Sequence, residues 1–252
     1  MADDSLERLV HAVRDRNPRA IGRLITMFEN SDPSTSGATK LMEPRATRNN
    51  VIGLTGAPGV GKSTVTNALI SEISRRGNTV AVLAVDPSSP ISRGALLGDR
   101  LRMQEHATDP NVFIRSMASR GHLGGLAAAA GEVVRILQYA DFDYVLVETV
   151  GVGQSEVEIV DAADTIVVLL APGMGDGIQA AKAGILEIGD IFVVNKADRE
   201  GARITEREVR SMIALSSNTE DSWQPPVIRT VGTTGEGIPE LFDRILTHQQ
   251  RG

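Results

Sequence analysis

Short apolar runs alternate with longer segments of helical periodicity along most of this chain of 252 residues. Runs such as YVLVE and TIVVLLA are apolar without polar alternation, which is typical of parallel strands buried on both faces. The segments between the runs, such as Gly121–Tyr139 and Gln179–Ile188, are long enough for crossover helices. The pattern therefore predicts an α/β fold with a doubly wound, mostly parallel sheet. The predicted strands are Val51–Thr55, Thr79–Val85, Val112–Arg115, Tyr144–Glu148, Thr165–Leu170, Ile191–Val194 and Val227–Val231.

The first fifty residues have a different pattern. Residues 5–28 carry apolar side chains at helical spacing, interrupted at Asn17-Pro18, and predict two short helices. The polar stretch Ser31–Asn50, which contains Pro, Gly and Ser, predicts a linker or mobile connection. We therefore expect an N-terminal helical extension with its linker in residues 1–50 and a single α/β domain in residues 51–252.

The composition narrows the classes of function. A net charge of −6 without a basic run, together with 3% aromatic residues, argues against a nucleic-acid partner. The absence of cysteine excludes disulfides, thiolate metal sites and cysteine nucleophiles. The acidic start MADDSLERLV does not resemble a signal peptide, and the longest apolar run, Ile166–Pro172, is too short to cross a bilayer. We therefore expect a cytoplasmic protein without a membrane partner.

The sequence GAPGVGKST follows the first predicted strand and matches the phosphate-loop pattern G-x-x-x-x-G-K-[ST]. Its glycines let the backbone turn tightly and aim N–H groups at phosphate oxygens, and the helix expected to begin near Lys62 adds the positive end of its dipole. Lys62 is expected to reach the β- and γ-phosphates, and the Ser63 hydroxyl to bind Mg²⁺. The predicted nucleotide-binding residues are Gly56, Ala57, Pro58, Gly59, Val60, Gly61, Lys62, Ser63 and Thr64.

The stretch Asn195-Lys196-Ala197-Asp198 follows the predicted strand IFVV and favours guanine as the base. The Asp198 carboxylate can accept hydrogen bonds from N1–H and from the 2-amino group of guanine. Adenine offers neither donor on that edge and would leave the carboxylate unpaired. Asn195 and Lys196 are expected to hold the loop and cover the ring. A polar turn at a strand end is the alternative, but the position several βα units after the phosphate loop favours GTP.

Polar residues end four of the predicted strands, and open α/β sheets bind ligands beyond that edge. Mg²⁺ takes oxygen ligands, and the candidates are Ser63, Asp86, Asp99 and Glu148. Glu148-Thr149-Val150-Gly151 resembles the D-x-x-G switch of GTPases with Glu in place of Asp, and the Gly151 N–H is expected to donate to the γ-phosphate. For each carboxylate, a helix N-cap or an ordinary surface charge is the alternative.

Together these motifs closely resemble the GTPase chaperones of methylmalonyl-CoA mutase, a family that includes the methylmalonic aciduria type A protein and members labelled arginine/ornithine transport kinases. The resemblance covers nearly the whole chain and implies a P-loop GTPase of the SIMIBI class with a short N-terminal helical extension. It rests on GAPGVGKST, LAVDPSSPISRGALLGDRLRM, SRGHLGGLA, VETVGVGQSE, APGMGDGIQAAKAG, VVNKAD and GEGI.

The resemblance also implies site roles. A first switch would run from about Asp86 to Arg102, with Asp86 and Asp99 near Mg²⁺ and the attacking water. A second switch would hold Glu148 and Gly151–Gln154. A third would fall on Gly175–Lys182, with Gly177 where relatives usually carry an acidic residue. The residues implied in mutase-stimulated hydrolysis there are Asp176, Gln179 and Lys182, and the predicted catalytic set is Lys62, Asp99, Glu148 and Lys182.

A loop at Val231-Gly232-Thr233 replaces the commoner Ser-Ala-type loop over guanine, so base contacts there are expected to come from the backbone. The implied function is Mg²⁺-dependent hydrolysis of GTP to GDP that gates cobalamin loading and protection of methylmalonyl-CoA mutase. A nickel-type metallochaperone and a transport-associated kinase are the alternatives, although the four histidines share no ligand spacing. Relatives continue into a helical dimerisation arm whereas this sequence stops at Gly252, which leaves a homodimer open.

Overall fold

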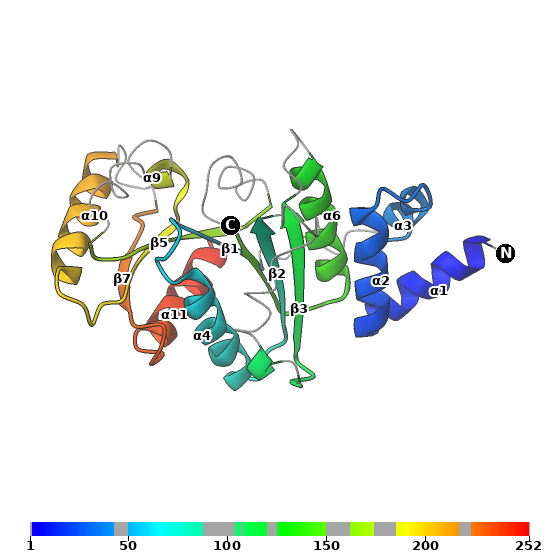
Figure 1. Ribbon diagram of the computed structural model, residues 1–252, viewed down its shortest axis with the longest axis horizontal. Helices are drawn as coiled ribbons and strands as arrows, with labels where there is room; N and C mark the ends of the chain where they lie inside the picture. Colours follow the sequence, from blue (N-terminus) through cyan, green and yellow to red (C-terminus); the bar gives the residue numbers. More distant parts are fainter. Residues whose placement is uncertain are drawn as a thin grey trace.

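Seven parallel strands form one sheet at the centre of the molecule, in the order β3-β2-β4-β1-β5-β6-β7 (Figure 1). The computed structural model describes residues 2–42, 50–87, 104–106, 108–119, 125–149, 162–173, 185–216 and 223–251. The strands are β1 (Val51–Thr55), β2 (Val80–Pro87), β3 (Val112–Ser119), β4 (Tyr144–Glu148), β5 (Thr165–Leu170), β6 (Ile191–Asn195) and β7 (Val227–Thr230). The predicted doubly wound sheet is confirmed.

Helices cover both faces of this sheet. Neighbouring residues on a strand point to opposite faces, and Val51 and Ile52 accordingly belong to two different cores. The core around Ile52 contains side chains of α4 and α11, and the other face packs on α6 and, nearer β7, on α10. The helices are α1 (Ala2–Arg14), α2 (Pro18–Glu29), α3 (Thr35–Leu41), α4 (Lys62–Arg75), α6 (Gly125–Tyr139), α9 (Ile185–Ile188), α10 (Ala202–Ser216) and α11 (Ile238–Gln249), with a 3₁₀ turn η1 (Gln104–His106).

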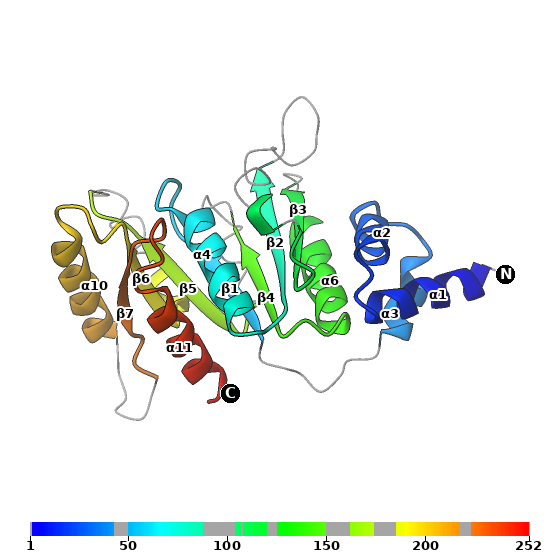
Figure 2. The ribbon, with the colours of Figure 1, turned by 90° about the horizontal axis from the view of Figure 1, so that it is seen from below.

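The N-terminal helices lie beyond the β3 end of the sheet, opposite α10 (Figures 1 and 2). The expected break falls at Asn17, whose Oδ1 caps α2 by accepting from the N–H groups of Arg19 and Ala20. Leu24 of α2 is fully buried and belongs to the same core as the helix α6 and one face of the sheet. The N-terminal helices and the sheet therefore share one apolar core.

The predicted linker at Ser31–Asn50 is wrong in part, because Thr35–Leu41 form helix α3. This helix contacts α1, and its Ala38 is fully buried. The sequence TSGATKL has weak helix formers and one buried position, so tertiary packing rather than propensity holds this helix.

Three aspartates secure the amino-terminal edge of the sheet. Each stands directly before a strand, and its Oδ2 accepts a backbone N–H from the strand beside it or from the residue just before that strand. The pairs are Asp143 with Thr79, Asp164 with Val51 and Asp190 with Ile166, each at 2.8 Å. These bonds satisfy strand-end donors that would otherwise need water.

In the described part of the chain, no helix has the length and apolar character that a membrane span needs.

Candidate functional site

The predicted phosphate loop joins the carboxyl end of β1 to the first turn of α4, as the sequence pattern requires. Gly61 caps this helix with a φ of 96°, in the left-handed region, and a Cβ there would collide with the Asn195 side-chain amide. Only glycine fits that position. The Nζ of Lys62 donates to the carbonyl oxygens of Gly56 and Ala57 at 2.7 and 3.2 Å. The ammonium group is therefore held over the loop where phosphates are expected.

Two of the predicted metal ligands meet at this rim of the sheet. The Ser63 hydroxyl donates to Oε1 of Glu148 at 2.7 Å, and the two residues are 8% and 5% exposed. The strand register explains the meeting, because Glu148 at the end of β4 lies beside Leu54 of β1. A hydroxyl and a carboxylate are oxygen donors of the kind that Mg²⁺ prefers, so this pair fits the ion.

Asn195 connects the phosphate loop to the segments that follow β6 and β7. Its amide nitrogen donates to the carbonyl of Val60 at 2.9 Å. Its Oδ1 accepts from the Thr230 hydroxyl and from the Gly232 N–H, both at 3.1 Å. Asn195 is 2% exposed, so these bonds lie in a low-dielectric setting and fix the three segments against one another.

The predicted guanine-reading residues lie next to this connection. Lys196, with a φ of 58°, sends its Nζ to the carbonyl of Gly59 at 2.6 Å. Asp198 is exposed in the turn that follows. The bond from the Val231 N–H to the Glu236 carbonyl, 3.0 Å long, closes the loop that contains Gly232 and Thr233. The phosphate loop (Gly56–Thr64), the base turn (Asn195–Asp198) and the base loop (Val231–Thr233) thus form one polar frame along the rim of the sheet.

Several predicted residues are not placed by the structure. Asp86 lies near the end of β2, two residues beyond the position that pairs with Glu148, and its side chain is outside the description. Asp99, Lys182 and most of the three predicted switches lie outside the described residues. Sequence reasoning missed Thr230, whose hydroxyl holds Asn195, although its position next to the last residue of the predicted strand Val227–Val231 was an available signal.

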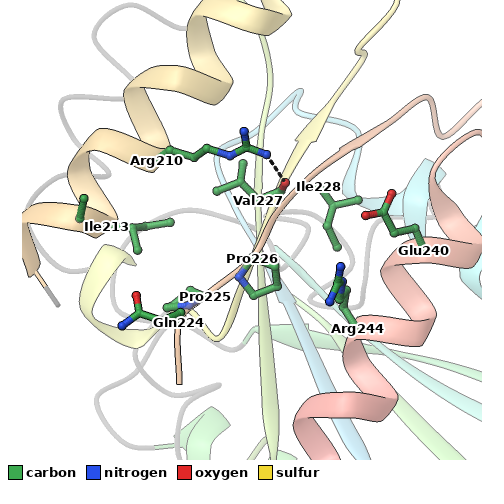
Figure 3. A pocket seen from close by; sticks show the side chains of 10 residues that line it. Arg210, Ile213, Gln224, Pro225, Pro226, Val227, Ile228, Glu240 and Arg244 are labelled. Atoms are coloured by element: carbon green, nitrogen blue, oxygen red, sulfur yellow. Dashed lines mark hydrogen bonds between the residues drawn. The ribbon is translucent and has the colours of Figure 1, made fainter. Parts of the chain in front are cut away.

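A separate hollow of about 500 Å³ opens beside β7, between α10 and α11 (Figure 3). Pro225 and Pro226 line it, and Arg210 at its border donates to the Val227 carbonyl at 3.4 Å. Pro225, Pro226 and Val227 lie at or before the start of β7, whereas Thr230 and the polar frame lie at the other end of this strand. The candidate site is therefore the frame at the carboxyl ends of the strands, where open α/β sheets bind their ligands.

A family model described as "Methylmalonyl Co-A mutase-associated GTPase MeaB" matches residues 21–251. The chain belongs to this family. A relative from Pyrococcus horikoshii, named as a GTPase, is 49% identical over 247 residues, which are 97% of this chain and 78% of that protein. The mouse protein "Methylmalonic aciduria type A homolog, mitochondrial" is 40% identical over 203 residues, 79% of this chain and 49% of that one.

A solved structure supports the same assignment. The crystal structure of a LAO/AO transport system kinase superimposes with a TM-score of 0.78 at 28% identity, over 98% of this chain and 76% of that one. As a member of the MeaB family, the protein is a GTPase that binds GTP and GDP, and the predicted family resemblance is confirmed.

Proposed function

We propose that this GTPase associates with methylmalonyl-CoA mutase, and that GTP hydrolysis gates loading and protection of the mutase's cobalamin cofactor. The family model is named for the mutase, and that name supports the choice of partner. The observation that carries the gating role is the 2.7 Å bond between Ser63 and Glu148. Glu148 ends β4 and belongs to the predicted second switch, so a ligand at Ser63 acts on the switch through one side chain.

In this proposal the polar frame binds the nucleotide in two parts. The phosphates lie on the loop Gly56–Thr64, where Lys62 exchanges its two carbonyl acceptors for phosphate oxygens. The guanine ring lies between Lys196 and the base loop, with its donor edge on Asp198. Asn195 keeps the two parts at a fixed separation, because it bonds the phosphate loop and the base loop at once.

Ser63, Glu148, Asp86 and Asp99 are the proposed magnesium residues, and the described pair meets the requirement for oxygen donors. When bound, Mg²⁺ supplies charge neutralisation for the phosphate oxygens. Ser63 keeps its hydroxyl oriented through Glu148, and Lys62 stabilises negative charge on the β- and γ-phosphates. Hydrolysis removes the γ-phosphate, to which the Gly151 N–H of the second switch is expected to donate. The second switch then loses this contact, and the surface that it presents to the mutase changes.

Binding to purified methylmalonyl-CoA mutase in two nucleotide states tests this proposal. The protein is loaded with GDP or with a non-hydrolysable GTP analogue, and its affinity for the immobilised mutase is measured. We expect the two affinities to differ by roughly tenfold, within the usual range of coupling between two sites. Lys62→Ala, which cannot hold a triphosphate, is the control and should show one affinity in both mixtures. Equal affinities of the parent protein in both states would contradict the gating role.

A further inference from the structure

The segment Val231–Gly237, which contains the predicted base loop Val231-Gly232-Thr233, packs on the first turn of α4. The Gly232 N–H donates to Asn195, and a Cβ at Gly232 would lie only 3.2 Å from Cγ2 of Thr64 and from Cγ2 of Val65. The loop thus lies in direct contact with the first turn of the phosphate-binding helix. Any displacement of the loop changes the distance between the base contacts and the phosphate contacts.

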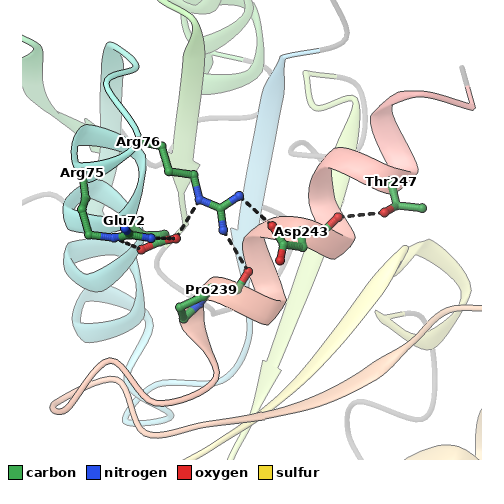
Figure 4. A network of polar contacts seen from close by, with 6 residues as sticks. All are labelled: Glu72, Arg75, Arg76, Pro239, Asp243 and Thr247. Carbon is green, nitrogen blue, oxygen red and sulfur yellow. Dashed lines mark hydrogen bonds and ion pairs between the residues drawn. The ribbon is translucent and has the colours of Figure 1, made fainter.

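The C-terminal end of α4 contacts α11, the helix that follows this loop (Figure 4). Glu72, whose side chain is 7% exposed, accepts from Nε of Arg76 at 2.7 Å. Arg76 then reaches α11, with Nη1 2.6 Å from Oδ1 of Asp243 and Nη2 3.4 Å from the Pro239 carbonyl. Its guanidinium also lies over the Phe242 ring, 4.8 Å from the ring centre. One arginine therefore contacts three residues in the first two turns of α11.

The base loop has little freedom to move independently of α11. The Val231 N–H bonds the Glu236 carbonyl, and the Ile238 N–H bonds the Gly235 carbonyl. Gly237, which caps α11, has a φ of 77° and lies so close to Arg229 that a Cβ would collide with its carbonyl. A shift of α11 is therefore passed directly to the loop.

The bond between Arg76 and Glu72 is stronger than an ordinary surface ion pair, whereas Asp243, the charged partner on α11, is 62% exposed. The Arg76 side chain is 26% exposed and Glu72 is 7% exposed, so their charge-assisted bond is largely shielded from water. Hydrogen bonds from Arg75 and then Arg76 hold the pKa of Glu72 below its usual value. Glu72 is thus ionised at neutral pH and keeps Arg76 aimed at α11.

We infer that Arg76 is a positioning residue for guanine recognition: by holding α11 on α4, it sets the position of the base loop so that the Thr233 N–H meets the O6 acceptor of guanine. The inference rests on the proposed guanine site. It assigns a role to a residue twelve positions beyond Thr64, the last residue of the phosphate loop, at the far end of the helix that begins in that loop.

Two base analogues separate this inference from the proposed site. 6-Thioguanosine diphosphate keeps the donors that Asp198 reads but weakens the O6 acceptor, whereas inosine diphosphate lacks the 2-amino donor and keeps O6. For the parent protein we expect GDP to be preferred over the thio analogue by roughly five- to tenfold, as one amide–carbonyl bond would give. In Arg76→Gln this preference should fall to about twofold while the preference over inosine diphosphate stays unchanged.

Asp243→Asn provides a second variant; because Asp243 is 62% exposed, we expect its replacement to leave the fold intact. It should move the thio preference in the same direction. Arg75→Gln is the matched control: Arg75 also bonds Glu72, but it is 68% exposed and these bonds stay within α4. Arg75→Gln should leave both preferences unchanged.

Two results would overturn the inference: an unchanged thio preference in Arg76→Gln and Asp243→Asn, or equal losses of both preferences, which would indicate general loosening of the fold. If Arg76→Gln does not fold, Asp243→Asn decides alone. A parent protein that does not distinguish GDP from inosine diphosphate would instead contradict the proposed role of Asp198, which is a separate outcome.

Discussion

Among single residues, the base turn has one buried side chain that holds the loop and one exposed side chain that is proposed to bind the base. Asn195 is buried and fully engaged by the protein, whereas Asp198 is exposed three residues later. We expect Asp198→Asn to lower GDP affinity about a hundredfold, because hydrogen bonds to a charged group are worth about 1.5–3 kcal/mol each. The variant should gain relative affinity for xanthosine diphosphate, and calorimetric titration of both nucleotides would show it. Unchanged GDP affinity would exclude Asp198 from the base site.

Lys62 and Glu148 both belong to the site, but their contacts predict that replacing them impairs different functions: GTP binding for Lys62 and turnover for Glu148. Glu148 accepts from the Ser63 hydroxyl, and a glutamine oxygen can do the same. Glu148→Gln should therefore keep nucleotide affinity within about threefold while lowering turnover and its Mg²⁺ dependence. Lys62→Ala should lose tight GTP binding, because the loop has no other cation. Filter binding and steady-state hydrolysis would separate the two variants, and the same loss of both functions in both variants would show that the roles are misassigned.

At the scale of elements, the contact between α4 and α11 depends on an ionised carboxylate. The folded-state pKa of Glu72 is lowered mainly by Arg75, so its contribution to stability is present above its usual pKa of 4.5 and is lost as pH falls through the lowered value. Glu72→Gln should reduce the free energy of unfolding by about 2 kcal/mol at pH 7.

Urea unfolding of both proteins from pH 7 to pH 3 would measure this dependence. The difference between parent and Glu72→Gln should stay constant down to about pH 5 and then shrink. A difference that is independent of pH would mean that Glu72 acts only by packing.

The strands and the main helices were predictable because both faces of the sheet are buried. That burial makes runs such as IFVVN continuously apolar and places their polar ends at one rim, so Glu148 and Asn195 could be assigned from order alone. Boundaries were less exact, and β3 extends to Ser119 rather than to Arg115. Helix α3 was missed because its formation depends on contact with α1, which no local pattern contains.

The contacts inside the site could not be derived from the motifs. The sequence indicates that Lys196 and Asn195 belong near the phosphate loop, but only the fold shows that they bond Gly59 and Val60. The strand-edge aspartates did leave a signal, since Asp143, Asp164 and Asp190 each directly precede an apolar run. The contacts of Arg76 span more than 160 residues of chain, and no spacing rule reports such a pair.

At the scale of the whole molecule, the N-terminal helices and the sheet should unfold together. Leu24 of α2 is fully buried in the core that α2 shares with α6 and the sheet. Leu24→Ala should lower the free energy of unfolding by about 3 kcal/mol. Trp223, the single tryptophan of the chain, donates to the carbonyl of Asp190, the residue directly before β6. Its fluorescence therefore reports on the side of the sheet opposite to Leu24.

In urea, the Trp223 fluorescence transition of Leu24→Ala should shift to lower concentration together with the loss of helical circular dichroism. A fluorescence transition that stays in place while part of the helical signal is lost earlier would show that residues 1–50 fold as an independent unit.

Single-turnover GTP hydrolysis with and without methylmalonyl-CoA mutase tests whether the mutase controls hydrolysis at this site. The phosphate loop contains no arginine, and GTPases without such a residue are slower by roughly 10³–10⁵-fold than those supplied with one. We predict slow hydrolysis by the protein alone and clear acceleration by the mutase, with acceleration but not basal hydrolysis lost in Lys182→Ala. Fast hydrolysis without the mutase, or a rate that the mutase leaves unchanged, would contradict control of this GTPase by the mutase.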